Sequence, residues 1–242
     1  MCGRYALSAN ALDIALQFEA DGSSAPSLPV NWNISPTTPI YFIQGQSPDG
    51  NSRIVNTAHW GLIPSWSKDA SRASNAINAR VESIAEKPSF KSALRSRRCL
   101  IPANGYYEWA TELGPYPPKQ PFYISRGDST LLPMAGLYEY WKDPETGQMI
   151  TSASIITRES VGNIATIHHR MPVMLPKDRW SAWLDSSSIS ESQVPEYLDL
   201  LETPDPEAGL QFHPVAAAVN NARNFGQELS APITLGEPET LF

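Results

Sequence analysis

Apolar and polar positions along the chain predict a fold made mostly of short strands. Runs of β-branched, aromatic and other apolar residues are separated by Gly, Pro, Asn and Asp. The predicted strands are Ile40–Ile43, Ile54–His59, Phe122–Ser125, Leu131–Trp141, Ile150–Thr157 and, late in the chain, Leu210–Val219. The 22 prolines are spread over the whole chain, and no internal repeat is visible. We therefore expect one domain over residues 1–242.

Between these runs, apolar residues recur at the spacing of an α-helix. Ser8 precedes an apolar stripe and predicts a capped helix over Ala9–Ala20. A helical stretch is expected over Ala76–Arg98, broken near Pro88. Shorter helices are expected over Pro176–Leu184 and Val194–Leu201. These elements predict an α+β fold: a single compact domain with a curved antiparallel, β-barrel-like core of short strands and peripheral helices.

Composition narrows the class of protein. The 242 residues are 41% hydrophobic, which is enough for a sizeable core. No run of 18 apolar residues predicts a membrane helix, and the start of the chain lacks a secretory pattern, so we expect an intracellular protein. A disulfide between Cys2 and Cys99 is not expected in a reducing compartment. No zinc spacing or glycine-rich phosphate loop is found, so we expect neither a metal nor a cofactor.

Charge is distributed unevenly. The net charge is −7, but the segment Lys68–Arg98 holds eight basic and three acidic residues. From Asp178 to the end there are eleven acidic and two basic residues. Trp60 and Trp66 directly precede the basic segment, and aromatics beside cationic groups can stack unpaired bases. A solvated helix surface is the alternative for the basic run, and a core position is the alternative for Trp60.

Cys2 is the first candidate for chemistry. Removal of Met1 leaves an N-terminal cysteine, which carries an α-amine and a thiol on adjacent carbons. The amine has a reference pKa of about 7.7–8.0 and can form a Schiff base with an aldehyde. The thiol can then close a five-membered thiazolidine. The alternative is that Cys2 occupies this position without function.

Other polar groups stand where the local pattern does not require them. Glu108 lies between two aromatic residues, so its pKa should rise toward the range useful for acid–base work. His168 follows an apolar pair and could exchange a proton near neutral pH. Arg80 and Arg170 could each hold a phosphate. A surface glutamate, a core histidine and ordinary ion pairs are the alternatives.

These segments together resemble a known family. Seven ordered motifs carry the resemblance: Met1–Tyr5, Asn33–Thr37, Trp60–Trp66, Asn78–Glu82, Pro102–Trp109, Ile167–Pro172 and Val219–Asn220. The chain is similar to the SRAP (SOS-response-associated peptidase) family, abasic-site-processing proteins that crosslink to single-stranded DNA. The resemblance covers nearly the whole chain.

The resemblance implies roles for individual residues. Cys2, freed of Met1, would attack the aldehyde of an abasic deoxyribose. Asn78 matches the asparagine that positions the cysteine, Glu108 the acid/base and His168 the histidine near the sugar. The implied DNA-binding residues are Arg4, Pro36, Trp66, Arg80 and Arg170. His169 departs from the family pattern, in which an aspartate or asparagine is expected.

The implied partner is single-stranded DNA containing abasic sites, bound by a monomer without membrane contact. The expected location is the bacterial cytoplasm at the nucleoid, or the nucleus in a eukaryote. A cysteine peptidase using Cys2, His168 and Asn78, with autoproteolytic loss of Met1, is a second hypothesis. A non-enzymatic single-strand-binding module is a third, and the acidic C-terminal third questions how tightly DNA is held.

Overall fold

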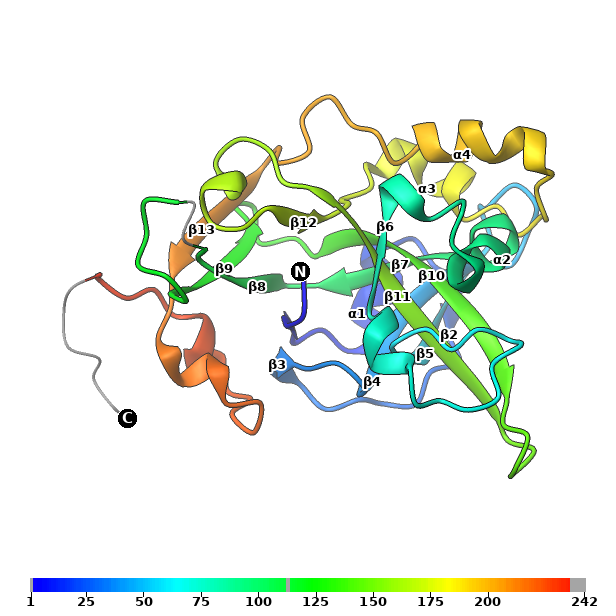
Figure 1. The fold of residues 1–242 in the computed structure, drawn as a ribbon, viewed down its shortest axis with the longest axis horizontal. Helices are drawn as coiled ribbons and strands as arrows, with labels where there is room; N and C mark the ends of the chain where they lie inside the picture. The colour runs from blue at the N-terminus through cyan, green and yellow to red at the C-terminus, as the bar shows by residue number, and fades with distance from the viewer. Residues whose placement is uncertain (1, 112–113, 236–242) are drawn as a thin grey trace.

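The computed structural model describes residues 2–111 and 114–235, which form two sheets with short helices around them (Figure 1). The strands are β1 (Tyr5–Leu7), β2 (Gly22–Ser23), β3 (Asn31–Ile34), β4 (Pro39–Gly45), β5 (Arg53–Trp60), β6 (Asn78–Arg80), β7 (Arg98–Ala103), β8 (Gly105–Trp109), β9 (Pro121–Arg126), β10 (Leu132–Lys142), β11 (Met149–Glu159), β12 (Arg170–Pro172) and β13 (Leu210–Pro214). The α-helices are α1 (Ala11–Gln17), α2 (Pro88–Ser96), α3 (Trp180–Trp183) and α4 (Val194–Asp199). The α+β class is confirmed.

The larger sheet closes on itself. Its strand order is β12-β11-β10-β7-β4-β5-β2, and β11 also pairs with β5, so β11, β10, β7, β4 and β5 form a ring. The closing pair is parallel and joins Ser152 to His59 and Ala153 to Trp60. The predicted barrel-like core is therefore confirmed. The expected antiparallel pairing holds for most of the ring but not for β11–β5, because five strands that alternate in direction cannot close a ring without one parallel pair.

The smaller sheet carries the start of the chain. Its order is β13-β9-β8-β1-β3. β1 pairs antiparallel with β8, with Tyr5 opposite Tyr106, and with β3, with Tyr5 opposite Ile34. The residues of β1 are all buried. The N-terminal strand is thus a central strand, with partners on both sides.

The five runs predicted as strands in the middle of the chain are confirmed as β4, β5, β9, β10 and β11, with small shifts at their ends. The late strand is shorter than predicted: β13 ends at Pro214, and a 3₁₀ turn covers Ala217–Asn220. The prediction over Val194–Leu201 corresponds to α4. The one over Pro176–Leu184 becomes a 3₁₀ turn followed by α3.

The first helix differs from its prediction in its cap. Asn10, not Ser8, caps α1, because its side chain accepts the N–H groups of Leu12 and Asp13. Leu12 and Leu16 are 74% and 83% exposed, whereas Ile14 is buried in the core. The hydroxyl of Ser8 instead donates to Asn104.

The prediction of helix over Ala76–Arg98 is wrong in its first half. Residues 78–80 form β6, which pairs parallel with β11, with Asn78 opposite Ile155. The helix α2 begins only at Pro88, at the position where the sequence showed a break. An open edge of β11 offers hydrogen bonds that a short helix cannot match, so tertiary pairing overrides local propensity.

Cys2 and Cys99 are both free and buried. Among the described residues no group of three or more His, Cys, Asp or Glu side chains is arranged to hold a metal ion. No helix within the described ranges is long and apolar enough to cross a membrane.

Candidate functional site

Cys2 lies directly before β1 and has no exposed surface. Its side chain belongs to the main apolar core cluster. Burial raises the pKa of the Cys2 thiol, and the nearby Glu108 carboxylate raises it further. The sulfur is therefore held as a neutral thiol rather than a thiolate. Met1, whose removal was predicted, lies outside the described residues.

Asn78 holds the backbone of Cys2 in place. It is the first residue of β6, so its position is fixed by the pairing of β6 with β11. Its Nδ2 donates to the carbonyl oxygen of Cys2 at 2.8 Å. Among the described residues the buried Oδ1 of Asn78 has no hydrogen-bond partner. One carboxamide thus anchors Cys2 and leaves an acceptor open beside it.

Glu108 is buried on β8, opposite Phe122 of β9, and is only 2% exposed. Burial raises its pKa to about 7, which bears out the effect expected from its aromatic neighbours. Because β8 also pairs with β1, the carboxyl group is on the strand next to the one that follows Cys2. This carboxyl can give or take a proton near neutral pH.

His168 lies between a 3₁₀ turn at Ile164–Thr166 and β12. Its Nδ1 is 3.7 Å from Oε2 of Glu108, 3.0 Å from the main-chain nitrogen of Arg170 and 3.1 Å from the carbonyl oxygen of Arg170. Burial lowers the pKa of His168 to about 4. The ring of the exposed His169 lies alongside, with centroids 4.4 Å apart. His168 is therefore the histidine that faces Glu108.

Two of the arginines expected to bind DNA are engaged with the protein itself. Nη1 and Nη2 of Arg170 contact the two carboxylate oxygens of Glu82 at 2.6 and 3.0 Å, and Nη2 also donates to the Thr157 carbonyl. Arg170 is 8% exposed, so the ion pair that the sequence left open is present. Nη1 of Arg4 donates to Oδ1 of Asn33 at 2.7 Å, and Arg4 is half-buried.

The other candidate DNA-binding residues are accessible. Arg80 is exposed at the end of β6, and Trp66 is 64% exposed. Pro36 lies half-buried in the turn after β3. Trp60 is fully buried, and its Nε1 donates to the Ile77 carbonyl, so the core position expected for it is confirmed.

A groove of about 710 Å³ runs along the predicted basic segment. Its lining includes Trp66, Lys68, Arg72, Asn75 and Lys87. Asn75 is three residues before Asn78, so this groove adjoins the strand that holds Cys2. An exposed indole beside three cationic side chains suits a polyanion with flat bases.

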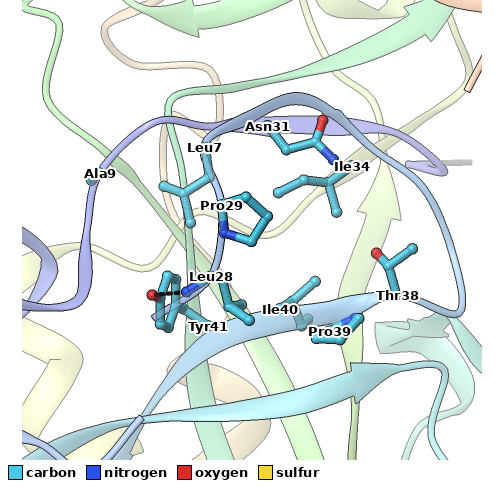
Figure 2. A pocket seen from close by; sticks show the side chains of 10 residues that line it. All are labelled: Leu7, Ala9, Leu28, Pro29, Asn31, Ile34, Thr38, Pro39, Ile40 and Tyr41. Atoms are coloured by element: carbon cyan, nitrogen blue, oxygen red, sulfur yellow. Dashed lines mark hydrogen bonds between the residues drawn. The ribbon is translucent and has the colours of Figure 1, made fainter. Parts of the chain in front are cut away.

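A second hollow is unrelated to these residues. It is a small apolar pocket of about 130 Å³ between the start of β4 and the segment before β3 (Figure 2). Leu7, Leu28, Pro29 and Ile40 line it, and the hydroxyl of Tyr41 at its edge accepts the N–H of Leu28. No predicted catalytic residue lines it, and its polar groups are few.

Sequence reasoning missed Asn33, which is buried and bonds Arg4. The signal was present, since Asn33 begins one of the seven quoted motifs. No chemical role could be attached to it, because the carbonyl groups that its side chain contacts lie almost two hundred residues away.

Comparison with known proteins agrees with this geometry. Residues 1–222 match the family described as SOS response associated peptidase (SRAP). The chain belongs to the SRAP family.

Relatives of this SRAP protein match over most of its length. The abasic site processing protein YoqW of Bacillus subtilis (strain 168) is 37% identical over 234 residues, which are 95% of this chain and 98% of that protein. The abasic site processing protein HMCES of Pongo abelii is 34% identical over 81% of this chain and 61% of its own length. A crystal structure of a protein from Bacteroides thetaiotaomicron has a TM-score of 0.80 at 27% identity, and covers 96% of this chain and 100% of that one.

Proposed function

We propose that this protein recognises abasic sites in single-stranded DNA and links to them covalently through Cys2 once Met1 has been removed. The main support is that two groups from distant strands meet at Cys2. Asn78 donates a hydrogen bond to the Cys2 carbonyl, and the nearby Glu108 carboxylate raises the pKa of the Cys2 thiol. The names of the relatives, which refer to abasic site processing, support the substrate.

The chemistry starts from the ring-opened sugar, which presents an aldehyde. The neutral α-amine of Cys2 adds to the aldehyde carbon and gives a carbinolamine. Loss of its hydroxyl as water gives the imine. The thiol sulfur then adds to the imine carbon while its proton passes to the imine nitrogen, which closes the thiazolidine ring. The thiol of Cys2 supplies both the sulfur and the proton of this last step.

Glu108 and His168 divide the proton transfers. Protonated Glu108 donates to the departing hydroxyl of the carbinolamine, and its raised pKa keeps a useful fraction protonated at neutral pH. His168 stays neutral, since burial lowers its pKa to about 4, and its uncharged ring hydrogen-bonds a sugar oxygen. The open Oδ1 of Asn78 accepts an N–H of the Cys2 amine.

The groove lined by Trp66 binds the undamaged strand beside the abasic site. Bases stack on the exposed indole, and Lys68, Arg72 and Lys87, together with Arg80, neutralise phosphates. The protein acts as a monomer with DNA as its partner. The acidic C-terminal third lies outside this groove and does not supply its lining.

The peptidase hypothesis receives less support. A cysteine peptidase needs a thiolate, and burial raises the pKa of Cys2 in the opposite direction. Nδ1 of His168 lies 3.7 Å from the Glu108 carboxyl, so its ring is oriented toward that group. Autoproteolytic removal of Met1 is a separate step, which mass measurement of freshly made Glu108→Gln protein tests: retained Met1 supports it.

The deciding experiment uses three single-stranded oligonucleotides of one sequence. One carries an abasic site, one carries a tetrahydrofuran analogue that cannot open to an aldehyde, and one is undamaged. Only the first should give a band that survives denaturation, and Cys2→Ala should abolish it. An adduct with the tetrahydrofuran strand, or a full-strength adduct from Cys2→Ala, contradicts the mechanism.

A further inference from the structure

The segment Ala217–Phe225, called the brace below, is hydrogen-bonded to two strands of the smaller sheet that flank β1. It follows β13 and, coloured orange in Figure 1, lies beside β3. On β3 the N–H of Trp32 donates to the Phe225 carbonyl at 3.0 Å. On β8 the indole N–H of Trp109 donates to Oδ1 of Asn220 at 2.6 Å. Between these strands lies β1, which follows Cys2.

Asn33 is the centre of this connection. It is 1% exposed, and its Nδ2 lies 3.2, 3.1 and 2.8 Å from the carbonyl oxygens of Val219, Asn221 and Asn224. Its Oδ1 accepts a hydrogen bond from Arg4 Nη1 at 2.7 Å. The same nitrogen donates to the Val219 carbonyl at 3.0 Å. A single buried carboxamide thus joins the brace, β3 and the side chain of Arg4.

Arg4 connects Asn33 to the main chain beside the nucleophile, Cys2. Only Gly3 separates it from Cys2, and its own carbonyl accepts the N–H of Tyr107, the residue before Glu108, at 2.9 Å. Side chain and main chain of Arg4 are therefore both fixed. Asn78 holds the carbonyl of Cys2 from β6, on the larger sheet. Because Gly3 has no side chain to restrict its backbone, the position of Cys2 depends on anchors at both ends.

We infer that Asn33 is a positioning residue for the Cys2 reaction: it clamps the brace and orients Arg4, which fixes the distance of the N-terminal amine and thiol from Glu108. This inference rests on the proposed covalent function. Misplacement of a reacting group by about 1 Å can slow a reaction by about 10²-fold without changing how substrate binds. Loss of the hydrogen bond between Asn33 and Arg4 should therefore lower the maximal rate and leave DNA affinity unchanged.

Two substitutions of Asn33 distinguish the role of its Oδ1, which bonds Arg4, from that of its Nδ2, which bonds the brace. Asn33→Ala removes both the acceptor for Arg4 and the donors for the brace. Asn33→Asp keeps an oxygen for Arg4 but places a carboxylate against three carbonyl oxygens, which releases the brace. Asn104→Ala is the matched control, since Asn104 binds Ser8 at the far end of β1 and touches neither Arg4 nor the brace.

Single-turnover crosslinking gives the first readout. Asn33→Ala should lose at least about tenfold in maximal rate with the half-saturating DNA concentration unchanged, whereas Asn33→Asp should stay within about threefold of the parent rate. Trypsin should cut after the exposed Arg223 in both variants but not in the parent or in Asn104→Ala. A parent-like rate in Asn33→Ala, or equal losses in both variants, overturns the inference.

A second readout needs no DNA. Alkylation by iodoacetamide, followed by peptide mass analysis, should label Cys2 faster in Asn33→Ala than in the parent, with the buried Cys99 as an internal standard. Equal labelling of Cys2 in the two proteins overturns the inference. If the parent forms no adduct with abasic DNA, the proposed function fails, and this labelling still decides the role of Asn33.

Discussion

Oε2 of Glu108 lies 3.7 Å from Nδ1 of His168, and burial moves the pKa values of the two groups in opposite directions. The pKa of Glu108 rises to about 7, and that of His168 falls to about 4. Between these values the glutamate is protonated and the histidine is neutral. The acid of the pair is thus the carboxyl group, and the imidazole acts as a hydrogen-bonding group without charge.

The rate of crosslinking should follow a bell-shaped pH profile. The neutral fraction of the Cys2 amine increases as the pH approaches its reference pKa of about 7.7–8.0. The protonated fraction of Glu108 declines above about pH 7. Glu108→Gln should lower the rate by about 10²–10⁴-fold and remove the descending limb. His169→Ala is the control and should leave the profile intact. Single-turnover rates over pH 5–9 measure this, and a parent-like profile in Glu108→Gln excludes the carboxyl as the acid.

The same shift predicts how stability depends on pH. The folded protein binds the proton of Glu108 more tightly than the unfolded chain, because its pKa is raised from 4.5 to about 7. The contribution to the free energy of unfolding is complete below pH 4.5 and is lost as pH rises through 7. The Glu108→Gln variant has no carboxyl group at this position, so its free energy of unfolding does not fall in this way as the pH rises. Its stability relative to the parent should increase by about 3 kcal/mol between pH 4.5 and 8, measured by urea unfolding. A constant difference across that range contradicts the prediction.

Asn78→Asp should slow crosslinking at saturating DNA by at least about tenfold, since a carboxylate cannot donate to the Cys2 carbonyl and repels it. The change is close to isosteric, so packing is preserved. Asn75→Asp adds the same charge to the groove three residues earlier without a bond to Cys2. That control should weaken DNA binding but keep the maximal rate. The reverse pattern in the two variants disproves the anchoring role of Asn78.

Binding to undamaged single strands should weaken as salt rises, because neutralised phosphates release counterions at a slope of about −0.7 per contact. Arg80→Ala should reduce that slope by about one contact, and Trp66→Ala should cost about 1–3 kcal/mol at any salt concentration. Arg126→Ala, which removes an arginine paired with Asp128 outside the groove, should change neither. Fluorescence anisotropy at several salt concentrations measures all three. An unchanged slope in Arg80→Ala removes it from the interface.

Arg170→Ala should act mainly on stability. The substitution leaves the Thr157 carbonyl and the Glu82 carboxylate without their buried donor. We expect a loss of about 2–4 kcal/mol in the free energy of unfolding, and a smaller loss for Glu82→Gln, whose side chain is half exposed. Chemical denaturation of both variants gives these values. A stable Arg170→Ala with a reduced salt slope for DNA indicates a phosphate contact instead.

Four of the five strands of the ring, β4, β5, β10 and β11, were predictable because each is an apolar run bounded by turn residues, whereas β7 was not among the predicted strands. β6 was not predictable, because its three residues become a strand only through pairing with β11. Spacing alone also did not show which face of α1 is buried: the core receives Ile14 and Phe18, while Leu12 and Leu16 are exposed. Tertiary neighbours, which spacing cannot supply, decide both cases.

The candidate site was predictable residue by residue but not as a set of contacts. The aromatic neighbours of Glu108 predicted its desolvation, and the burial of its carboxyl group confirms that prediction. The partners of the arginines were invisible in sequence, because Glu82 and Arg170, or Asn33 and Arg4, meet only when separate strands pair. Electrostatic partners at such separations require the fold itself, and the DNA-binding roles of these residues stay predictions.

Burial of Cys2 between β1, β6 and β8 sets an order of events during synthesis. Its end of the chain is made first, while the partners that enclose it, Asn78 and Glu108, follow about a hundred residues later, on the order of ten seconds at ordinary elongation rates. A separate enzyme that removes Met1 can act within that interval, before Asn78 bonds the carbonyl of Cys2 and Glu108 is in place beside it. Maturation of the nucleophile can therefore precede the pairing of β1 with β8.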